Sequence, residues 1–350
     1  MDEANEILGE ISYTEIQEML NDMLGDDSFS VADYLTTLLQ GKSPVSFSGV
    51  CQTIFNGVLD HLVRERQLYL SLIFIAVLGA VFSNFSKLLQ GKRVAETAFY
   101  VVYLLFFSSF LTLFLETSQL AAETLTKLLE FMKVLFPAFF IAMGFTDSAL
   151  AAGAYYESVL AVILLVDLVL LKFAFPAVQI FFMLKIADQF SEQKMFSKMA
   201  ELIRDIVNFV MKTMFGLVMG FQVIQGLLLP VSSKVETSSV IRLSGAVPGV
   251  GNAISSIANT LLCAGTLVKN SVGVVGVIAV AFYCGIPLLK IISSRFLFQM
   301  TGALVQPVSD PRITGCFGAA VESMKLLVYA LFVGGMMFVL SITIISVMTS

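Results

Sequence analysis

Charged residues, histidine and tryptophan are all scarce in this sequence. Only 13% of its 350 residues are charged, one is histidine and none is tryptophan, whereas 57% are hydrophobic and the mean hydropathy is +0.88. Such a balance excludes an ordinary soluble domain. It is typical of a membrane protein, because a helix needs about 20 apolar residues to cross the hydrocarbon core.

Paired cysteines are also absent. The four cysteines, Cys51, Cys263, Cys284 and Cys316, are scattered and form no CxxC. The spacing predicts neither a disulfide framework nor a zinc site, so we interpret them as small buried hydrophobic residues. No His, Cys, Asp and Glu cluster has ligand spacing, and we expect no metal and no cofactor.

The sequence also has few candidate catalytic residues. The single histidine, His61, lies ahead of the first apolar segment and beside Arg64 and Arg66, where a solvated surface residue is the simpler interpretation. An aspartyl intramembrane protease would need a second carboxylate opposite Asp167, and Asp147 lies in a turn-like segment. We therefore expect no enzymatic activity.

Basic residues are missing from the start of the chain. Residues 1–41 contain many acidic side chains and no Lys or Arg, and MDEANEILGE has neither the basic nor the apolar part of a secretory signal. Such an arm would be repelled by nucleic acid, so no nucleic-acid partner is expected. We predict that residues 1–66 form an acidic, helical, extracytoplasmic arm.

Long apolar runs fill the rest of the chain, which predicts an all-α, polytopic membrane helix bundle over residues 67–350. Two shorter apolar pieces, 134–143 and 296–308, lie beside a proline or a charge and are expected to be re-entrant or interfacial. The predicted spans number about six and lie near residues 68–88, 98–115, 159–184, 206–229, 271–292 and 324–348.

Two further segments have amphipathic periodicity. Residues 116–136 carry a helical apolar stripe opposite Glu123 and Lys127, and residues 185–206 carry a Met-rich stripe close to Lys194 and Lys198. We expect both to be helices on the membrane surface, although connectors packed on their own bundle would show the same pattern. Lys and Arg are more frequent in the predicted inner loops, which favours both termini outside.

Residues 231–270 are predicted to form an amphipathic hairpin on the outer face. Its second half begins AVPGVGNAISSIANT, in which Asn252 and Asn259 lie on a polar, uncharged face of a helix. The Gly-Val-Gly is no dinucleotide fingerprint, because no βαβ unit surrounds it, and the chain has no P-loop. Amides facing lipid would be unsatisfied, so this face is expected to meet water, a pore or a partner, or to pack internally.

A few residues stand out inside the predicted spans. Asp167 and Lys172 are costly at membrane depth, and their spacing of five residues takes them off a common α-helical face, so we expect partners on other helices, such as Lys212. Gly273 and Gly276 predict close approach by a neighbouring helix.

The last third of the chain resembles a known family. The order PGVGNAISSIANTLLCAGTLVKNSVGVVGVI, GIPLLKII, LVQPVSDPRITGC and FVLSITIISV is similar to the stage III sporulation protein AE family of endospore-forming bacteria. Many relatives begin with a signal-like hydrophobic segment, whereas this chain does not. The positions that match the motif or flank it, and that we take as candidate interface residues, are Pro248, Gly249, Gly251, Asn252, Asn259, Lys269, Asn270, Gly273, Gly276 and Pro307.

The resemblance implies a subunit of the channel complex between mother cell and forespore. It implies residence in the mother-cell (outer forespore) membrane and partners that include a secretion-type ATPase, ring-forming subunits and other stage III sporulation A-type membrane proteins, with homo-oligomers among the expected assemblies. A platform or permease-like role is the leading hypothesis. A stand-alone secondary transporter and a non-conducting scaffold are the alternatives, and the absence of evident internal repeats counts against the transporter.

Overall fold

The structure is a computed structural model, and it describes residues 69–81, 92–144, 149–190, 194–244 and 251–347, together with Val63, Arg66 and Gln67. The acidic arm predicted over residues 1–66 lies almost entirely outside the described residues, so that assignment stays a prediction. Every described segment is helical apart from two short connections, and the predicted all-α class is confirmed.

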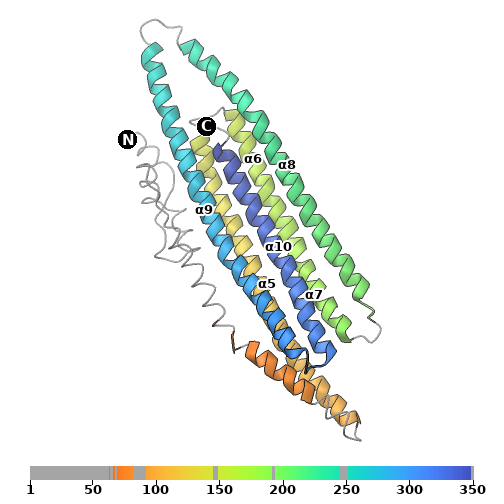
Figure 1. Cartoon of the computed structure of the whole chain (residues 1–350). Helices are drawn as coiled ribbons and strands as arrows, with labels where there is room; N and C mark the ends of the chain where they lie inside the picture. The colour runs from red at the N-terminus through yellow and green to blue at the C-terminus, as the bar shows by residue number, and fades with distance from the viewer. Residues whose placement is uncertain are drawn as a thin grey trace.

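Long helices run side by side and alternate in direction along the bundle (Figure 1). Three of the elements, α6, η1 and α7, follow one another without a break and form one continuous rod. The bounds are α5 Lys92–Gly144, α6 Ala149–Leu165, the π-helix η1 Val166–Ala174, α7 Phe175–Phe190, α8 Ser197–Ser244, α9 Gly251–Val305 and α10 Pro311–Val347.

Five of the described helical stretches are long and apolar enough to cross a membrane, and they confirm five of the predicted spans. They are Val101–Pro137, Gly153–Gln189, Ser197–Gln225, Val272–Val305 and Pro311–Ile344. The first predicted span, 68–88, is described only over the shorter apolar helix Tyr69–Val81. That helix lies at one end of the bundle, where the Tyr69 ring meets Phe298 at 5.2 Å between centroids.

The two pieces expected to be re-entrant or interfacial are continuous with long helices. Residues 134–143 continue α5 past Pro137, and residues 296–305 are the end of α9, followed by a turn over residues 306–309. They looked like separate pieces because apolar windows detect only the hydrophobic part of a helix. The backbone hydrogen bonds continue where the side chains become polar.

The surface helix predicted over residues 116–136 is also part of α5, inside the bundle. Its apolar positions, such as Leu125, Leu128 and Met132, are fully buried, while the opposite face is exposed. The amphipathic pattern is real, but its apolar face covers α9 and α10 rather than lipid headgroups. Of the two alternatives, packing on the protein's own bundle is the one observed.

The second predicted surface helix, 185–206, is interrupted by a connection. After α7 ends at Phe190, Lys194 takes a left-handed conformation with φ of 46°, and α8 starts at Ser197. The Asp188 carboxylate accepts a hydrogen bond from the Phe196 backbone N–H at 3.0 Å and holds this connection. The sharp reversal lets α7 and α8 pack against each other.

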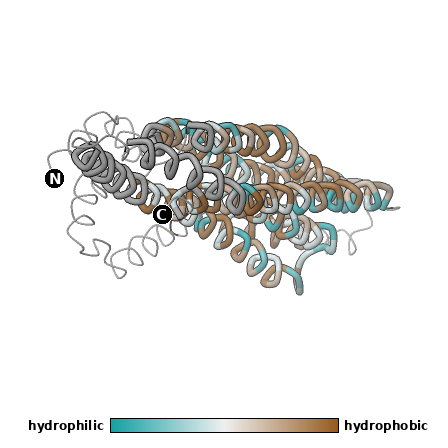
Figure 2. Tube along the Cα trace, turned by 90° about the horizontal axis from the view of Figure 1, so that it is seen from above, coloured by the Kyte–Doolittle hydropathy of each residue, from teal (hydrophilic) through white to brown (hydrophobic). Residues whose placement is uncertain are grey.

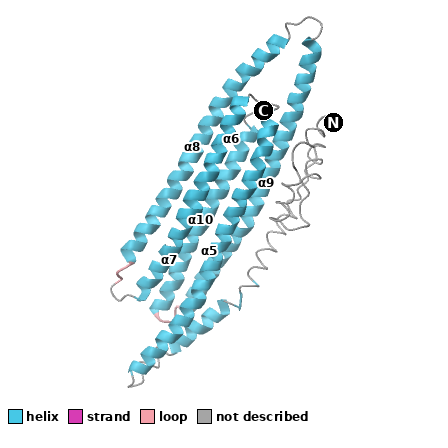
Figure 3. Ribbon diagram, turned by 180° about the vertical axis from the view of Figure 1, so that it is seen from behind, coloured by secondary structure: helices cyan, strands magenta, loops and turns pink. Residues whose placement is uncertain are grey.

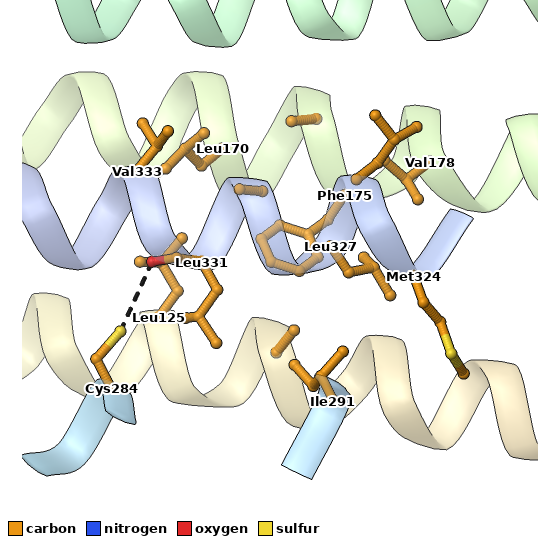
Figure 4. Packing of buried hydrophobic residues seen from close by; sticks show 14 of the residues in the cluster. Leu125, Leu170, Phe175, Val178, Cys284, Ile291, Met324, Leu327, Leu331 and Val333 are labelled. Atoms are coloured by element: carbon orange, nitrogen blue, oxygen red, sulfur yellow. Dashed lines mark hydrogen bonds between the residues drawn. The ribbon is translucent and has the colours of Figure 1, made fainter. Parts of the chain in front are cut away.

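The core consists of interlocking apolar side chains from most of the long helices (Figure 4). Aromatic rings dominate one end, where Phe110 contacts Phe298 at 5.1 Å and Phe317 at 5.3 Å between ring centroids. Phe114 stacks on Phe182 at 3.7 Å. These contacts bring α5, α7, α9 and α10 together, since aromatic pairs add to the stabilisation from burial alone.

Many large apolar side chains are exposed on the outside of the bundle, and hydrophobic residues predominate along the described helices (Figure 2). Leu164, Leu168 and Leu217 are each more than half exposed. Three helices are far longer than a crossing requires: α5 has 53 residues, α8 has 48 and α9 has 55. At 1.5 Å per residue they extend over roughly 70–80 Å, so the bundle projects well beyond a hydrocarbon core of about 30 Å (Figure 3).

Candidate functional site

The ion pair between Asp167 and Lys172 lies in the π-helix η1. Lys172 Nζ is 2.7 Å from Asp167 Oδ2, with the Lys172 side chain more exposed than that of Asp167. Both residues lie within the membrane-length stretch Gly153–Gln189. An ion pair at this depth lowers the cost of placing either charge near lipid.

The expectation that these two residues would pair with other helices was wrong. It assumed α-helical geometry, in which residues five apart diverge. In η1 the hydrogen bonds run i→i+5, as shown by the Phe175 N–H bonding to the Leu170 carbonyl, and this places residues five apart above one another. Pro176, which lacks a backbone N–H and therefore disturbs α-helical hydrogen bonding, lies two residues after the end of η1.

Lys212, suggested as the partner of Asp167, lies instead along a groove between α8 and α10. The groove has a volume of about 760 Å³ and includes Lys325, after which α10 has no charged residue as far as Val347. Lys185 bonds Glu322 at 3.0 Å and Arg204 bonds Asp205 at 3.1 Å in or beside it. Its charged lining is Arg204, Lys212 and Lys325 against Asp205 and Glu322, an excess of one positive charge.

The glycines of α9 allow close packing within the chain. A Cβ added at Gly273 would lie 2.6 Å from Ser346 Oγ of α10, and one at Gly276 would lie 2.9 Å from Leu135 Cδ2 of α5. Both distances are too short for an unadjusted contact, so the absence of a side chain sets how closely these helices approach.

Sequence reasoning missed two comparable glycines in α10, although the pair GG in FVGGMM was a visible signal. A Cβ at Gly334 would meet Leu125 Cδ1 at 2.6 Å, and one at Gly335 would meet Cys284 Sγ at 2.7 Å. The Cys284 thiol donates to the Leu331 carbonyl at 3.6 Å next to this contact (Figure 4). By contrast, Gly216 and Gly220 of α8 have no neighbouring atom within 4 Å among the described residues.

The other motif positions are described only in part. Pro248 and Gly249 lie outside the described residues. Helix α9 begins at Gly251, but the side chains of Asn252, Asn259, Lys269 and Asn270 lie outside the described part. Their polar face and the hairpin over residues 231–270 therefore stay predictions.

Pro307 is in the turn between α9 and α10. Val308 N–H and Ser309 N–H both bond the Val305 carbonyl, at 3.1 and 2.9 Å, and close the end of α9. Asp310 then starts α10, since its Oδ1 accepts from the Arg312 N–H at 2.9 Å. Proline after one helix and an acidic cap before the next explain why the LVQPVSDPRITGC stretch folds as a tight reversal.

A buried polar pair joins α8 and α10 at membrane depth. Gln222 Nε2 donates to Ser341 Oγ, and Ser341 Oγ donates to the Met337 carbonyl at 2.8 Å. Both side chains are almost fully buried. The pair fixes the register of two helices whose other contacts are non-directional.

Comparison with known proteins agrees with this architecture. The stage III sporulation protein AE family matches residues 29–349, which is most of the chain and includes every described long helix. The chain belongs to the stage III sporulation protein AE family. Stage III sporulation protein AE of Bacillus subtilis (strain 168) is 22% identical over 346 residues, covering 99% of this chain and 82% of that protein. No solved structure matches the chain.

Membership of the stage III sporulation protein AE family assigns the chain a role in sporulation, and the five membrane-length helices make it a membrane protein. The family name specifies no chemical reaction. The site features described above are an ion pair within η1, together with close-packed glycines and a buried polar pair that join neighbouring helices.

Proposed function

We propose that this protein is a platform or permease-like subunit of the sporulation channel complex that links mother cell and forespore. The observation that carries this proposal is the family match over residues 29–349. In this role the chain works by assembly rather than by catalysis. It resides in the mother-cell (outer forespore) membrane and binds other stage III sporulation A-type membrane proteins, including a secretion-type ATPase and ring-forming subunits.

The geometry supports a platform for a physical reason. Helices α5, α8 and α9 are more than twice as long as a single crossing needs, so parts of them extend outside the bilayer. Long, closely packed helices provide rigid surfaces on which soluble or membrane partners can assemble. Helix α9 begins at Gly251, so the predicted asparagine face would lie at one end of this extension.

The test is purification of the tagged full-length chain from sporulating cells under mild detergent. The proposal expects the ATPase and the ring-forming subunits to co-purify, and expects cells lacking the protein to arrest after engulfment. A chain that purifies without these partners, and that alone carries solute flux in liposomes, would instead establish the stand-alone transporter.

A further inference from the structure

The exposed face of α5 is mostly polar between residues 112 and 133, whereas it is apolar nearer the start of the helix, at Val101, Leu104 and Leu105. Its exposed positions recur at helical spacing, and the opposite positions are buried in the core. We call the polar residues of this part the α5 stripe; they are Thr112, Glu116, Gln119, Glu123, Thr126, Lys127, Glu130 and Lys133, all exposed except the half-buried Lys127, and Leu115 is an exposed apolar residue among them.

The α5 stripe is as long as a bilayer is thick. From Thr112 to Lys133 the helix rises about 31 Å, compared with a hydrocarbon core of about 30 Å. Gln119 Nε2 donates to Glu123 Oε1 at 2.7 Å, and Thr126 Oγ1 donates to the Ala122 carbonyl at 2.9 Å, so the polar groups are ordered along the helix surface.

Contacts to the core place most of the stripe at membrane depth. Leu125 lies against Gly334 of α10, and Leu135 lies against Gly276 of α9. Around these glycines the sequence has no charged residue from Ser271 to Leu289 in α9 or from Leu326 to Val347 in α10. The part of the stripe from Glu123 to Lys133 is therefore level with the most apolar part of the bundle.

Lipid is a poor neighbour for this face. A charged side chain at the centre of a membrane helix costs roughly 2.5–3.5 kcal/mol on insertion scales, and the stripe presents several. Exposed apolar side chains at the same level, such as Leu168 next to Leu170, show what a lipid-facing surface of this bundle looks like. Because the polar positions are confined to one face of α5, that face has a different environment.

A dry contact between two copies is also unfavourable. Two copies inserted in the same orientation have each residue at the same depth in the membrane. When their stripes face each other, each residue therefore lies opposite the same residue of the other copy. Glu123 would then meet Glu123, and Glu130 would meet Glu130. Like charges brought together without water cost several kcal/mol.

We propose that the α5 stripe lines a water-filled path across the membrane, formed where copies of this chain turn their stripes toward a common centre. Water between the copies keeps Glu116, Glu123, Glu130 and Lys133 hydrated and separates equal charges. These three carboxylates and the Lys133 ammonium group make the path predominantly acidic. Rings of such residues favour small hydrated cations and polar solutes over anions.

This inference rests on the proposed function, because it would supply that channel complex with its aqueous passage. It can be tested separately by thiol labelling in membranes of sporulating cells. Cys51 and Cys263 are changed to Ser, while the buried Cys284 and Cys316 are retained as the background. Single cysteines then replace Gln119, Glu123, Thr126 and Glu130, and a charged methanethiosulfonate reagent that does not cross membranes is added.

The matched control is Leu168→Cys, an exposed apolar position at the same level. Only a thiolate reacts, and a thiol in hydrocarbon does not ionise. All four stripe positions are expected to react at least about tenfold faster than Leu168→Cys, because water reaches them. Thr126→Cys keeps the size of the side chain, so its labelling stays informative even if loss of a charged residue harms folding.

Stripe cysteines that react no faster than Leu168→Cys would overturn the inference, whether lipid or another protein covers them. That outcome would leave the proposed function intact if the partners still co-purify. Rapid labelling without co-purification would instead support a wet stripe and contradict the platform role. The two failures are therefore distinguishable.

Discussion

Gly273 of α9 lies so close to Ser346 of α10 that a methyl group on its Cα would come within 2.8 Å of the Ser346 Cβ. A serine Cβ cannot move without its backbone, so the helices themselves would have to separate. This contact joins the middle of α9 to the C-terminal end of α10, and these two helices share the most extensive interface between the described elements. It gives the LVKNSVGVVGV stretch a structural reason for its glycines.

Gly273→Ala is therefore expected to destabilise the protein by about 1–3 kcal/mol, the usual cost of overpacking. Gly285→Ala on the same helix is the matched control, since no atom lies within 4 Å of a Cβ there among the described residues, and alanine favours a helix. The measurement is thermal unfolding in detergent. Adding Ser346→Gly should restore the stability lost in Gly273→Ala, and equal melting temperatures for both alanine variants would contradict the explanation.

Neutralising one member of the Asp167–Lys172 pair is expected to harm the protein more than neutralising both. Asp167→Asn or Lys172→Gln leaves a lone charge at membrane depth, at a cost of roughly 2.5–3.5 kcal/mol, whereas the double variant leaves none. Protein level in the membrane and spore yield are the readouts. The Lys198–Glu201 pair, with Nζ and Oε2 at 3.2 Å and the lysine 93% exposed, is the control. Its removal should cost little because it is solvated.

If the double Asp167→Asn, Lys172→Gln variant behaves no better than the worse single variant, the two side chains do not act as a pair. Normal protein levels and normal sporulation in Asp167→Asn alone would show that neither folding nor function depends on this carboxylate.

Removing one partner of the buried hydrogen bond between Gln222 and Ser341 is expected to lower the free energy of unfolding by about 1–3 kcal/mol. Ser341→Ala leaves the Gln222 amide N–H groups unsatisfied, and the Gln222 Oε1 already has no hydrogen-bond partner among the described residues. Combining Gln222→Leu with Ser341→Ala removes both polar groups, so the melting temperature in detergent should return close to that of the parent protein. Additive losses in the double variant would count against this account.

The connection between α7 and α8 offers a stabilising change. Lys194 has a φ of 46°, a conformation that costs a residue with a Cβ roughly 1–2 kcal/mol, so Lys194→Gly is expected to raise the melting temperature. Lys194→Ala retains the Cβ and should give no such gain. Asp188→Ala should lower the melting temperature by removing the carboxylate that holds the Phe196 N–H. An unchanged melting temperature in Lys194→Gly would show that this turn is not under strain.

The sequence predicted the membrane spans well because hydrophobicity decides them directly. It could not predict where helices end, since α5 continues through Pro137 into residues that look like a separate segment. The interior position of residues 116–136 was hidden for a related reason. An apolar stripe has the same periodicity whether it covers lipid headgroups or a neighbouring helix, and only the contacts of Leu125 and Leu135 distinguish the two.

Site geometry was harder to predict than the fold. The pairing of Asp167 with Lys172 depends on nine residues of π-helix, and α-helical spacing argued against it. The motif glycines were identifiable as small residues, but the sequence did not show that Gly273 and Gly276 pack inside the chain rather than against another subunit. The α5 stripe was partly visible in the sequence as the polar side containing Glu123 and Lys127. Its depth in the membrane could be inferred only from the way α5 packs against α9 and α10.

The π-helix also determines where the chain length can change. Deleting a residue from an ordinary α-helix turns everything beyond it by about 100°, which would face the wrong side chains toward the core. Within η1 each hydrogen-bonded loop already holds one residue more than an α-helical loop. Deleting one residue there would return this segment to α-helical geometry, and α6 and α7 would keep their present faces toward α5, α8 and α10. Within the continuous rod of α6, η1 and α7, we therefore expect η1 to tolerate a single-residue deletion best.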